Sequence, residues 1–286
     1  MTVLRDQVVL ITGAASGIGR QMALIAAGRG AQVVGWDVDS VGLARLVDDT
    51  GQAGRAATVQ VVDVTDRRAV ADAAAATEDR HGRVDVLVNN AGVVSGATLL
   101  ELTDEQIERV MAVNALALFW CTRAVLPGMV GRDHGHIVTI ASVASTMGAP
   151  RLVDYAASKH AAYGFAQSLR VELARTAPHL RTTVVLPSYI DTGMFEGARA
   201  RLPWLLPVLS QEHVAERVIV AVERNEPRVA MPRWGVAPFA WQLLPTRWFD
   251  ALAEALGLFD TMDDFHGRSV LAPRASTAGE RSLRDH

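Results

Sequence analysis

The stretch Thr12-Gly13-Ala14-Ala15-Ser16-Gly17-Ile18-Gly19 decides the fold, because it places three glycines between two segments of different apolar period. The preceding run, Val8–Ile11, is too short for a helix and continuously apolar, as a buried strand should be. The segment 17–29 has helical spacing. Glycine is needed where a backbone turns tightly or a Cβ would collide with a bound group. The sequence therefore predicts a strand, a tight turn and a helix.

The same alternation continues along the chain. Short apolar runs with many β-branched residues are each followed by a longer segment with helical spacing, which predicts βαβ units and a Rossmann-type, doubly wound parallel sheet. We find no internal repeat and no Ser/Gly-rich linker, so we expect a single α/β domain. The further expected strands are 32–36, 57–62, 84–88, 136–140, 182–186 and 228–231, and the further helices are 40–49, 66–80, 104–130, 154–176 and 211–224.

Composition narrows the function classes. The 286 residues are 50% hydrophobic and carry a net charge of −3, which gives no electrostatic reason to expect nucleic acid as a partner. The single cysteine, Cys121, cannot form an intrachain disulfide, which fits a reducing compartment. We see no signal peptide and no strongly apolar, uncharged stretch long enough to span a membrane. The expectation is a cytoplasmic protein, with no metal site predicted.

The composition shifts after about residue 232. Four of the six tryptophans lie beyond residue 200, among Pro, Leu and Phe. We expect a core over 1–232 and an apolar, helical extension over 233–286 that ends in a disordered polar tail from Arg274. The favoured interpretation of the extension is a lid or subunit contact. Because arginines flank the tryptophans, peripheral contact with lipid is the alternative.

The glycine-rich turn has the context of a dinucleotide site. A helix opening there presents free N–H groups and its positive dipole end to a pyrophosphate. Asp37 follows the second strand, 24 positions after Gly13, where a carboxylate can accept hydrogen bonds from both adenine ribose hydroxyls and repel a 2′-phosphate. No Arg or Lys lies beside it, so NAD(H) is favoured over NADP(H). The alternative is that Asp37 caps the next helix, although Asp39 and Ser40 are better placed for that.

Further motifs follow in order: Asn89-Asn90-Ala91-Gly92 after the fourth strand, Asn114 in a long helix, Ser142 after the fifth strand, and Tyr155-Ala156-Ala157-Ser158-Lys159 opening the next helix. Together with the glycine-rich turn, this arrangement resembles the short-chain dehydrogenase/reductase superfamily, in its shorter single-domain branch. The resemblance covers about residues 7–192. Beyond it, the C-terminal part is loosely similar to the extension of hydroxysteroid and retinol dehydrogenases.

The resemblance implies a catalytic set of Asn114, Ser142, Tyr155 and Lys159. Tyr155 and Lys159 are four residues apart and share one helical face. Because a free tyrosine has a pKa of about 10, we expect the nearby ammonium to favour the phenolate and so activate Tyr155 as acid/base. Ser142 would hydrogen-bond the substrate oxygen, and Asn114 would hold a water that links the lysine to solvent.

The resemblance also implies the cofactor contacts. In the loop after the sixth strand, Pro187-Ser188 stands where the family usually has Pro-Gly. Because serine has a Cβ, fewer φ and ψ angles are open to the backbone there than with glycine. The implied contacts are Gly13, Ser16, Gly17, Ile18, Gly19, Asp37, Asp63, Val64, Asn90, Ala91, Gly92, Tyr155, Lys159, Pro187, Ile190 and Thr192.

The implied activity is NAD(H)-dependent interconversion of a hydrophobic alcohol and its ketone or aldehyde, with a steroid, retinoid or lipid-like substrate and a homodimer or homotetramer. A non-catalytic dinucleotide sensor or scaffold of the same fold is the alternative, and an epimerase or dehydratase would need a longer substrate domain. An apolar substrate is indicated by the residues that we expect at the cleft: Val93, Val94, Val143, Met147, Leu152, Tyr189, Met194, Phe195, Leu202, Trp204 and Leu205.

Overall fold

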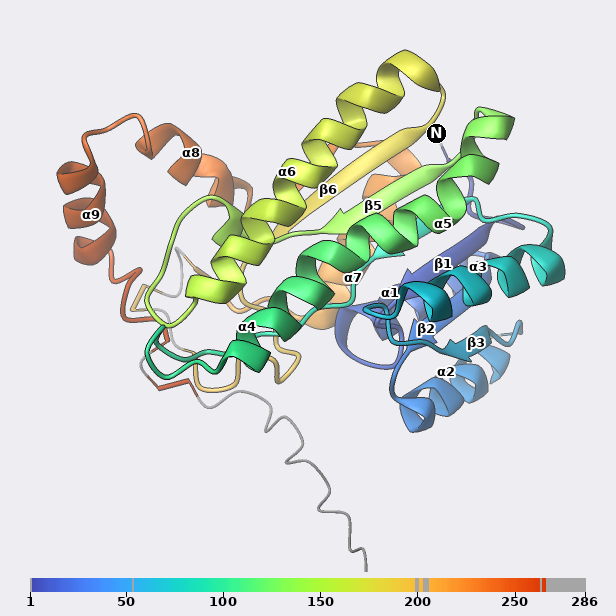
Figure 1. The fold of residues 1–286 in the computed structure, drawn as a ribbon, viewed down its shortest axis with the longest axis horizontal. Coiled ribbons are helices and arrows are strands. Elements are labelled where there is room, and N and C mark those ends of the chain that lie inside the picture. The colour runs from blue at the N-terminus through green and yellow to red at the C-terminus, as the bar shows by residue number, and fades with distance from the viewer. Residues whose placement is uncertain (1, 53, 199–200, 203–205, 263, 266–286) are drawn as a thin grey trace, which may run out of the picture.

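The computed structural model describes residues 2–52, 54–198, 201–202, 206–262 and 264–265 (Figure 1). Its seven strands form one parallel sheet in the order β3-β2-β1-β4-β5-β6-β7, which confirms the Rossmann-type doubly wound fold. Strand order reverses between β1 and β4, so chain crossovers cover both faces. The strands are β1 (Val8–Thr12), β2 (Gln32–Asp37), β3 (Thr58–Val61), β4 (Val86–Asn89), β5 (His136–Ile140), β6 (Arg181–Pro187) and β7 (Arg228–Met231).

Helices cover the sheet on two sides, and each side buries an apolar cluster of its own. On one side, α1 (Gly17–Gly28) packs against α7 (Gln211–Arg224) and α2 (Ser40–Gln52). On the other, α3 (Arg67–His81) packs against α5 (Ala117–Arg132), beside α6 (Val153–Thr176). All β strands are buried between these layers except at the edges, as the continuous apolar runs predicted.

The helix expected over 104–130 is not uniform. It consists of α4 (Asp104–Met111), a π-helical turn (Ala112–Leu116) and α5. The π turn inserts one residue into the helix, and such insertions often occur at functional sites. Asn114 lies within this turn, and its side chain is 1% exposed. The local distortion therefore coincides with a predicted site residue.

The run Asp104–Arg132 is, within the described residues, a helical stretch long and apolar enough to cross a membrane, where none was expected from the sequence. Half of its most apolar window is buried inside the protein. The buried side chains of α5 include Cys121, Val125 and Met129, which pack in the core beside the sheet. The run is therefore a core helix of this domain. Burial also raises the pKa of the Cys121 thiol to about 12, in agreement with the predicted core thiol.

The C-terminal extension is helical, as expected. After β7 it contains a 3₁₀ turn (Arg233–Val236), α8 (Ala237–Trp241) and α9 (Thr246–Ala255). These helices lie beyond the carboxyl ends of β5 and β6 (Figure 1). Tyr163 of α6 stacks on Phe239 with ring centres 5.2 Å apart, which joins the extension to the core. The polar tail from Arg274 lies outside the described residues.

Candidate active site

The glycine-rich turn connects β1 to α1, as predicted. Gly13 and Gly17 have φ angles of +68° and +57°, which favour glycine. A Cβ on Gly19 would lie 2.1 Å from the carbonyl oxygen of Gly13, so no other residue fits there. Ser16 precedes α1, and Ile18 is buried in its first turn. The first turn of α1 carries no acidic side chain, so its positive dipole end suits a pyrophosphate.

Asp37 ends β2 and faces this turn. Its Oδ2 accepts a hydrogen bond from the backbone N–H of Ala15 (3.0 Å), and its Oδ1 accepts one from Asp39 (3.0 Å). The capping alternative for Asp37 is wrong, because the Asp39 carboxylate accepts the free N–H groups of Val41 and Gly42 at the start of α2. Asp37 is thus held at the end of the turn, where a ribose would lie.

On the side where adenine contacts are predicted, the end of β1 is joined to the residues that follow β4. The Thr12 hydroxyl accepts hydrogen bonds from the N–H groups of Asn90 (3.0 Å) and Ala91 (3.1 Å), and the Asn90 amide donates to the Thr12 carbonyl oxygen (2.9 Å). Sequence reasoning missed this role of Thr12, although the residue stands at the start of the glycine-rich motif. These bonds fix the two strand ends relative to each other.

Asp63 and Val64 follow β3, the edge strand next to β2. Val64 is buried, and Asp63 accepts hydrogen bonds from Thr65 and from Arg109. Burial of Asp63 raises its pKa, but these hydrogen bonds and the charge of Arg109 outweigh burial and lower it below the usual value. Asp63 is therefore a charged, partly exposed carboxylate at this edge of the nucleotide site.

The four residues predicted as catalytic come together at the carboxyl ends of β4 and β5. The Lys159 amine lies 5.7 Å from the ring centre of Tyr155 and donates to the Ile140 carbonyl oxygen (2.9 Å). Gly92 lies beside both Asn114 and Lys159: a Cβ built on it would lie 3.5 Å from Asn114 Oδ1 and 3.6 Å from Lys159 Nζ, at ordinary contact distance. The Ser142 hydroxyl lies close enough to the Tyr155 phenol to influence its pKa, and it also donates to the Pro187 carbonyl oxygen (3.4 Å).

A shell of hydroxyl groups positions this cluster. Ser158 Oγ donates to the Tyr155 carbonyl oxygen (2.7 Å) and accepts from Asn114 Nδ2 (3.0 Å). Ser145 Oγ donates to the Lys159 carbonyl oxygen (2.8 Å). Asn114 also pairs with both backbone groups of Val93. Ser145 and Ser158 were not predicted as positioning residues, because their partners are brought near only by the fold.

Burial changes the expected pKa of Tyr155. Desolvation raises it, the hydrogen bond with Ser142 opposes that rise, and the nearby Tyr189 adds to it. Burial also lowers the pKa of the Lys159 amine to about 8. The expected lowering of the Tyr155 pKa is therefore wrong for this state, because both groups are shielded from water and the cost of desolvation outweighs the effect of a nearby ammonium. At neutral pH Tyr155 is a protonated phenol.

The loop after β6 reaches across to the glycine-rich turn. A Cβ on Gly17 would lie 3.3 Å from Thr192 Cγ2, and Ile190 pairs with Leu209 beyond the loop. Ser188, which replaces the family's glycine, has no positive φ. The Ser188 hydroxyl donates a hydrogen bond to the Pro207 carbonyl oxygen (3.0 Å). The Ser188 backbone N–H donates one to the Met231 carbonyl oxygen (2.8 Å). Ser188 therefore fastens the loop that Pro187 begins.

An apolar wall faces Tyr155. Of the residues predicted there, Val94, Leu152, Tyr189 and Phe195 pack around it, whereas Val93 packs against the core beside the sheet. Val143 instead contacts Gly235 of the extension. Met262 and Phe265 complete the wall and were missed, because nothing in the local pattern links them to Tyr155. Met147, Met194 and Leu202 are partly exposed, and Trp204 and Leu205 lie outside the described residues.

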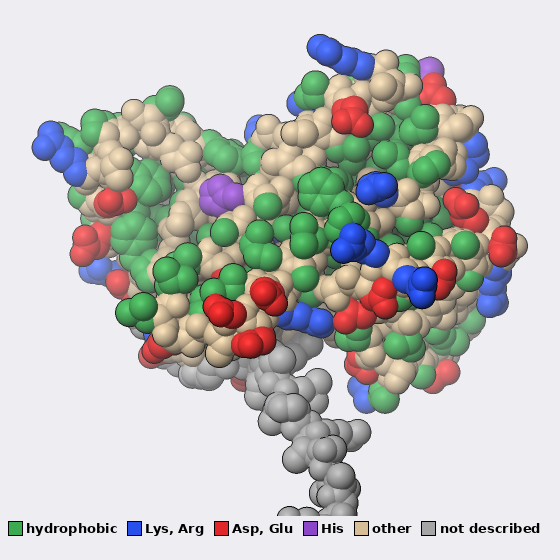
Figure 2. Space-filling model, viewed as in Figure 1, with side chains coloured by type: hydrophobic (Ala, Val, Ile, Leu, Met, Phe, Trp, Pro, Cys, Tyr) green, Lys and Arg blue, Asp and Glu red, His purple; other side chains and the backbone are tan. Residues whose placement is uncertain are grey.

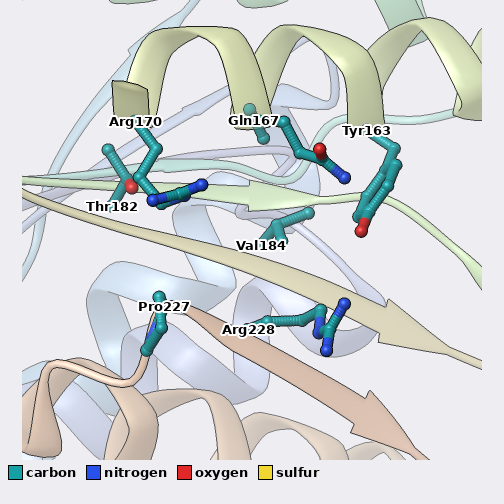
Figure 3. A pocket seen from close by; sticks show the side chains of 8 residues that line it. Tyr163, Gln167, Arg170, Thr182, Val184, Pro227 and Arg228 are labelled. Carbon is teal, nitrogen blue, oxygen red and sulfur yellow. The ribbon is translucent and has the colours of Figure 1, made fainter. Parts of the chain in front are cut away.

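A separate cavity of about 400 Å³ opens between α6, β6 and β7 (Figure 3). Tyr163, Gln167 and Arg170 of α6 and Arg228 of β7 line it. Its described lining shares no residue with the predicted site, so the cluster around Tyr155 remains the candidate active site.

Comparison with known proteins identifies this arrangement. The short chain dehydrogenase family model matches residues 7–203, well over half of the chain. The chain belongs to the short chain dehydrogenase family. This short chain dehydrogenase is 40% identical to the bovine short-chain dehydrogenase/reductase family 16C member 6, over 91% of this chain and 83% of that one. It is 38% identical to mouse epidermal retinol dehydrogenase 2, over 92% of this chain and 86% of that one.

Among solved structures, a short chain dehydrogenase/reductase from Burkholderia phymatum in complex with NAD has 28% identity and a TM-score of 0.74, covering 80% of this chain and 90% of that one. As a member of this family, the protein is an oxidoreductase that acts on CH–OH groups, and the related Burkholderia structure holds NAD. The glycine-rich turn and Asp37 fit that cofactor, since the turn leaves room for phosphates and the carboxylate suits an unphosphorylated ribose.

Proposed function

We propose that this enzyme oxidises a hydrophobic alcohol to its ketone or aldehyde, and catalyses the reverse reduction, with Tyr155 as the general acid/base. The observation that carries the proposal is the buried cluster of Ser142, Tyr155 and Lys159 beside an apolar wall. Because the Tyr155 phenol is protonated at neutral pH, it can donate its proton to a carbonyl oxygen during reduction; in alcohol oxidation its deprotonated form accepts the proton.

The nicotinamide supplies the hydride acceptor or donor when NAD(H) is bound. Ser142 hydrogen-bonds the substrate oxygen as charge develops on it, which also orients the Tyr155 hydroxyl. Lys159, held by the Ile140 carbonyl oxygen, stabilises negative charge on the phenol oxygen after the proton leaves. Asn114 holds the Val93 backbone in place and, with Ser158, connects the π turn to the catalytic helix.

We infer the substrate class from the wall around Tyr155. The phenol lies edge-on to Phe195, with ring centres 5.5 Å apart, and Phe195 in turn lies edge-on to Tyr189. Burying apolar substrate surface there contributes about 25 cal/mol per Å². The similarity to a protein named as a retinol dehydrogenase supports a retinoid-, steroid- or lipid-like alcohol.

The test is reduction of NAD⁺ at 340 nm with retinoid, steroid and long-chain alcohols. Turnover with at least one apolar alcohol, lost in Tyr155→Phe, is the expected result. NADH binding without any turnover would favour the alternative, a dinucleotide sensor. We prefer the enzyme because a sensor has no use for a complete Ser142, Tyr155 and Lys159 set.

The extension bears exposed apolar side chains next to arginines (Figure 2). Leu243 is 88% exposed and Trp248 is 61% exposed. We propose that this surface contacts a lipid interface from the cytoplasmic side, with Arg247 in water, and that a subunit contact is the alternative. Sedimentation with anionic liposomes should fall in a Leu243→Ser, Trp248→Ser variant and should not change in a Val208→Ser variant, whose exposed side chain lies on the core.

We also propose a homodimer or homotetramer. Leu116 and Phe119 leave apolar surface exposed at the start of α5, 47% and 44% respectively, and self-association would cover it. Light scattering after size exclusion tests this: a single monomer mass at micromolar concentration contradicts it.

A further inference from the structure

The last described part of the chain returns to Tyr155. The chain turns at Gly257 (φ +65°) after α9, and Leu258, Thr261 and Met262 are then buried. Met262, which is 1% exposed, packs in one apolar cluster with Tyr155 and Leu152. A side chain from the end of the extension thus lies beside the phenol of the active site.

A buried chain of hydroxyl groups fastens this segment. Tyr189 Oη donates to Thr261 Oγ1 (2.8 Å), and Thr261 Oγ1 donates to the Leu258 carbonyl oxygen (3.3 Å). Tyr189 follows β6 and lies against Phe195, which itself contacts Tyr155. The segment is therefore attached to the same loop that lines the substrate side of the site.

Phe265 makes a second attachment, to the loop after β4. A Cβ on Gly96 would lie 1.8 Å from the Phe265 ring, and Gly96 has φ +73°, so only glycine leaves room for the ring. Arg151 donates to the Gly96 carbonyl oxygen (3.3 Å) and lies just before the catalytic helix. The segment therefore spans from the loop after β6 to the loop after β4.

Together these contacts leave Tyr155 only 5% exposed. The apolar body of a substrate has to take up space that Met262 and Phe265 now fill. We propose that Thr261, Met262 and Phe265 form a specificity-determining cover: Met262 limits how bulky an apolar alcohol can lie against Tyr155, and the Tyr189–Thr261 hydrogen bond keeps the cover in place. This inference rests on the proposed function.

The first test compares kcat/KM for a bulky alicyclic alcohol with that for a short secondary alkanol. Met262→Ala removes the side chain beyond Cβ, and we expect the bulky-to-small ratio to rise about tenfold, since each methylene in an apolar pocket discriminates by that order. The matched control is Met129→Ala, which removes the same atoms from a fully buried position in α5. It should lower Tm and leave the ratio unchanged. A ratio within twofold of wild type in Met262→Ala, or an equal rise in Met129→Ala, overturns the proposal.

The second test does not depend on turnover. Amide hydrogen exchange over residues 258–262 of the full chain should be about fivefold faster in Thr261→Val, which lacks the hydroxyl, and should be near wild type in Thr261→Ser, which keeps it. Equal exchange in all three proteins overturns the fastening role. If the wild type oxidises none of the alcohols, the proposed function fails, while this exchange comparison still decides whether the cover exists.

Discussion

The Lys159 amine lies 5.7 Å from the ring centre of Tyr155, and both side chains are at least 95% shielded from water, with exposures of 4% and 5%. A charge on either group is therefore costly unless the other carries the opposite charge. This reciprocal dependence means that the proton on Tyr155 and the charge on Lys159 change together during the proposed reaction.

Removing the Tyr155 hydroxyl should lower kcat by about 10²–10⁴-fold, the usual contribution of a general acid/base. Tyr155→Phe keeps the ring that packs on Phe195, so NADH binding, followed by fluorescence, should be nearly unchanged. Tyr163→Phe, two helical turns further along α6, is the matched control and should keep wild-type kcat. Ordinary activity in Tyr155→Phe would remove this residue from the mechanism.

The direction of the reaction should determine its pH dependence. Burial raises the pKa of Tyr155, so the phenol stays protonated at neutral pH and is poised to donate a proton. We expect kcat for carbonyl reduction to be flat from pH 6 to 8 and kcat for alcohol oxidation to rise over that range. Stopped-flow single turnovers in both directions measure this, and an oxidation rate that falls with rising pH would contradict it.

Asp37→Ala should reduce the preference for NAD⁺ over NADP⁺ at least tenfold in kcat/KM, because it removes the carboxylate that repels a 2′-phosphate. The neighbouring Asp39 is the control, since it caps α2. Asp39→Ala should cost about 1 kcal/mol of stability and keep the cofactor preference. If both variants lost the preference for NAD⁺ equally, the preference would depend on the total negative charge near the turn and not on the position of Asp37.

Gly19→Ala should abolish NADH binding, because its Cβ would lie 2.1 Å from the Gly13 carbonyl oxygen and force the phosphate turn to move. Gly28→Ala at the end of the same helix meets no atom within 4 Å. That control should leave binding intact and change stability by about 0.5–1 kcal/mol in the favourable direction. Calorimetric titration with NADH separates the two, and tight binding by Gly19→Ala would contradict the close approach.

His136 should make the protein sensitive to acid. It is buried in β5, its Nε2 pairs with Thr183, and burial followed by the charge of Arg181 lowers its pKa to about 3. In the unfolded chain the His136 imidazole takes up a proton near pH 6.5. Between pH 6.5 and 3 the unfolded state therefore binds one more proton than the folded state. The free energy of unfolding then falls by about 1.4 kcal/mol for each unit that the pH is lowered. Urea unfolding at pH 7, 6 and 5 measures how the free energy of unfolding changes with pH. In His136→Gln we expect a smaller slope, because one fewer proton is taken up on unfolding. Identical slopes would assign the acid sensitivity to other groups.

Sequence reasoning predicted the elements whose pattern is local. The run from Val8 through Gly19 carries its strand, turn and helix within adjacent residues. The motifs at Asp37, Asn90 and Ser142 fall at or just after the carboxyl ends of strands that the sheet order brings together. It could not predict the π turn at Asn114, because one inserted residue barely alters an apolar period. The contact of Met262 with Tyr155 joins positions far apart in the sequence and leaves no periodic signal.

The Tyr155 pKa was predicted in the wrong direction for a related reason. Spacing shows that an ammonium is near, but only the packed structure shows that Leu152 and Met262 exclude the water that would stabilise a phenolate. Desolvation is a property of the surroundings in space, and it outweighed the local charge.

Lys159 is the only lysine in the chain, all other basic side chains being arginine or histidine. Its buried position at the centre of the site therefore gives the enzyme a single covalent handle: apart from the chain terminus, an amine-selective acylating reagent has one place to react. The extent of such labelling, read as one mass increment on the intact protein, reports how often the interior of the active site opens to solvent.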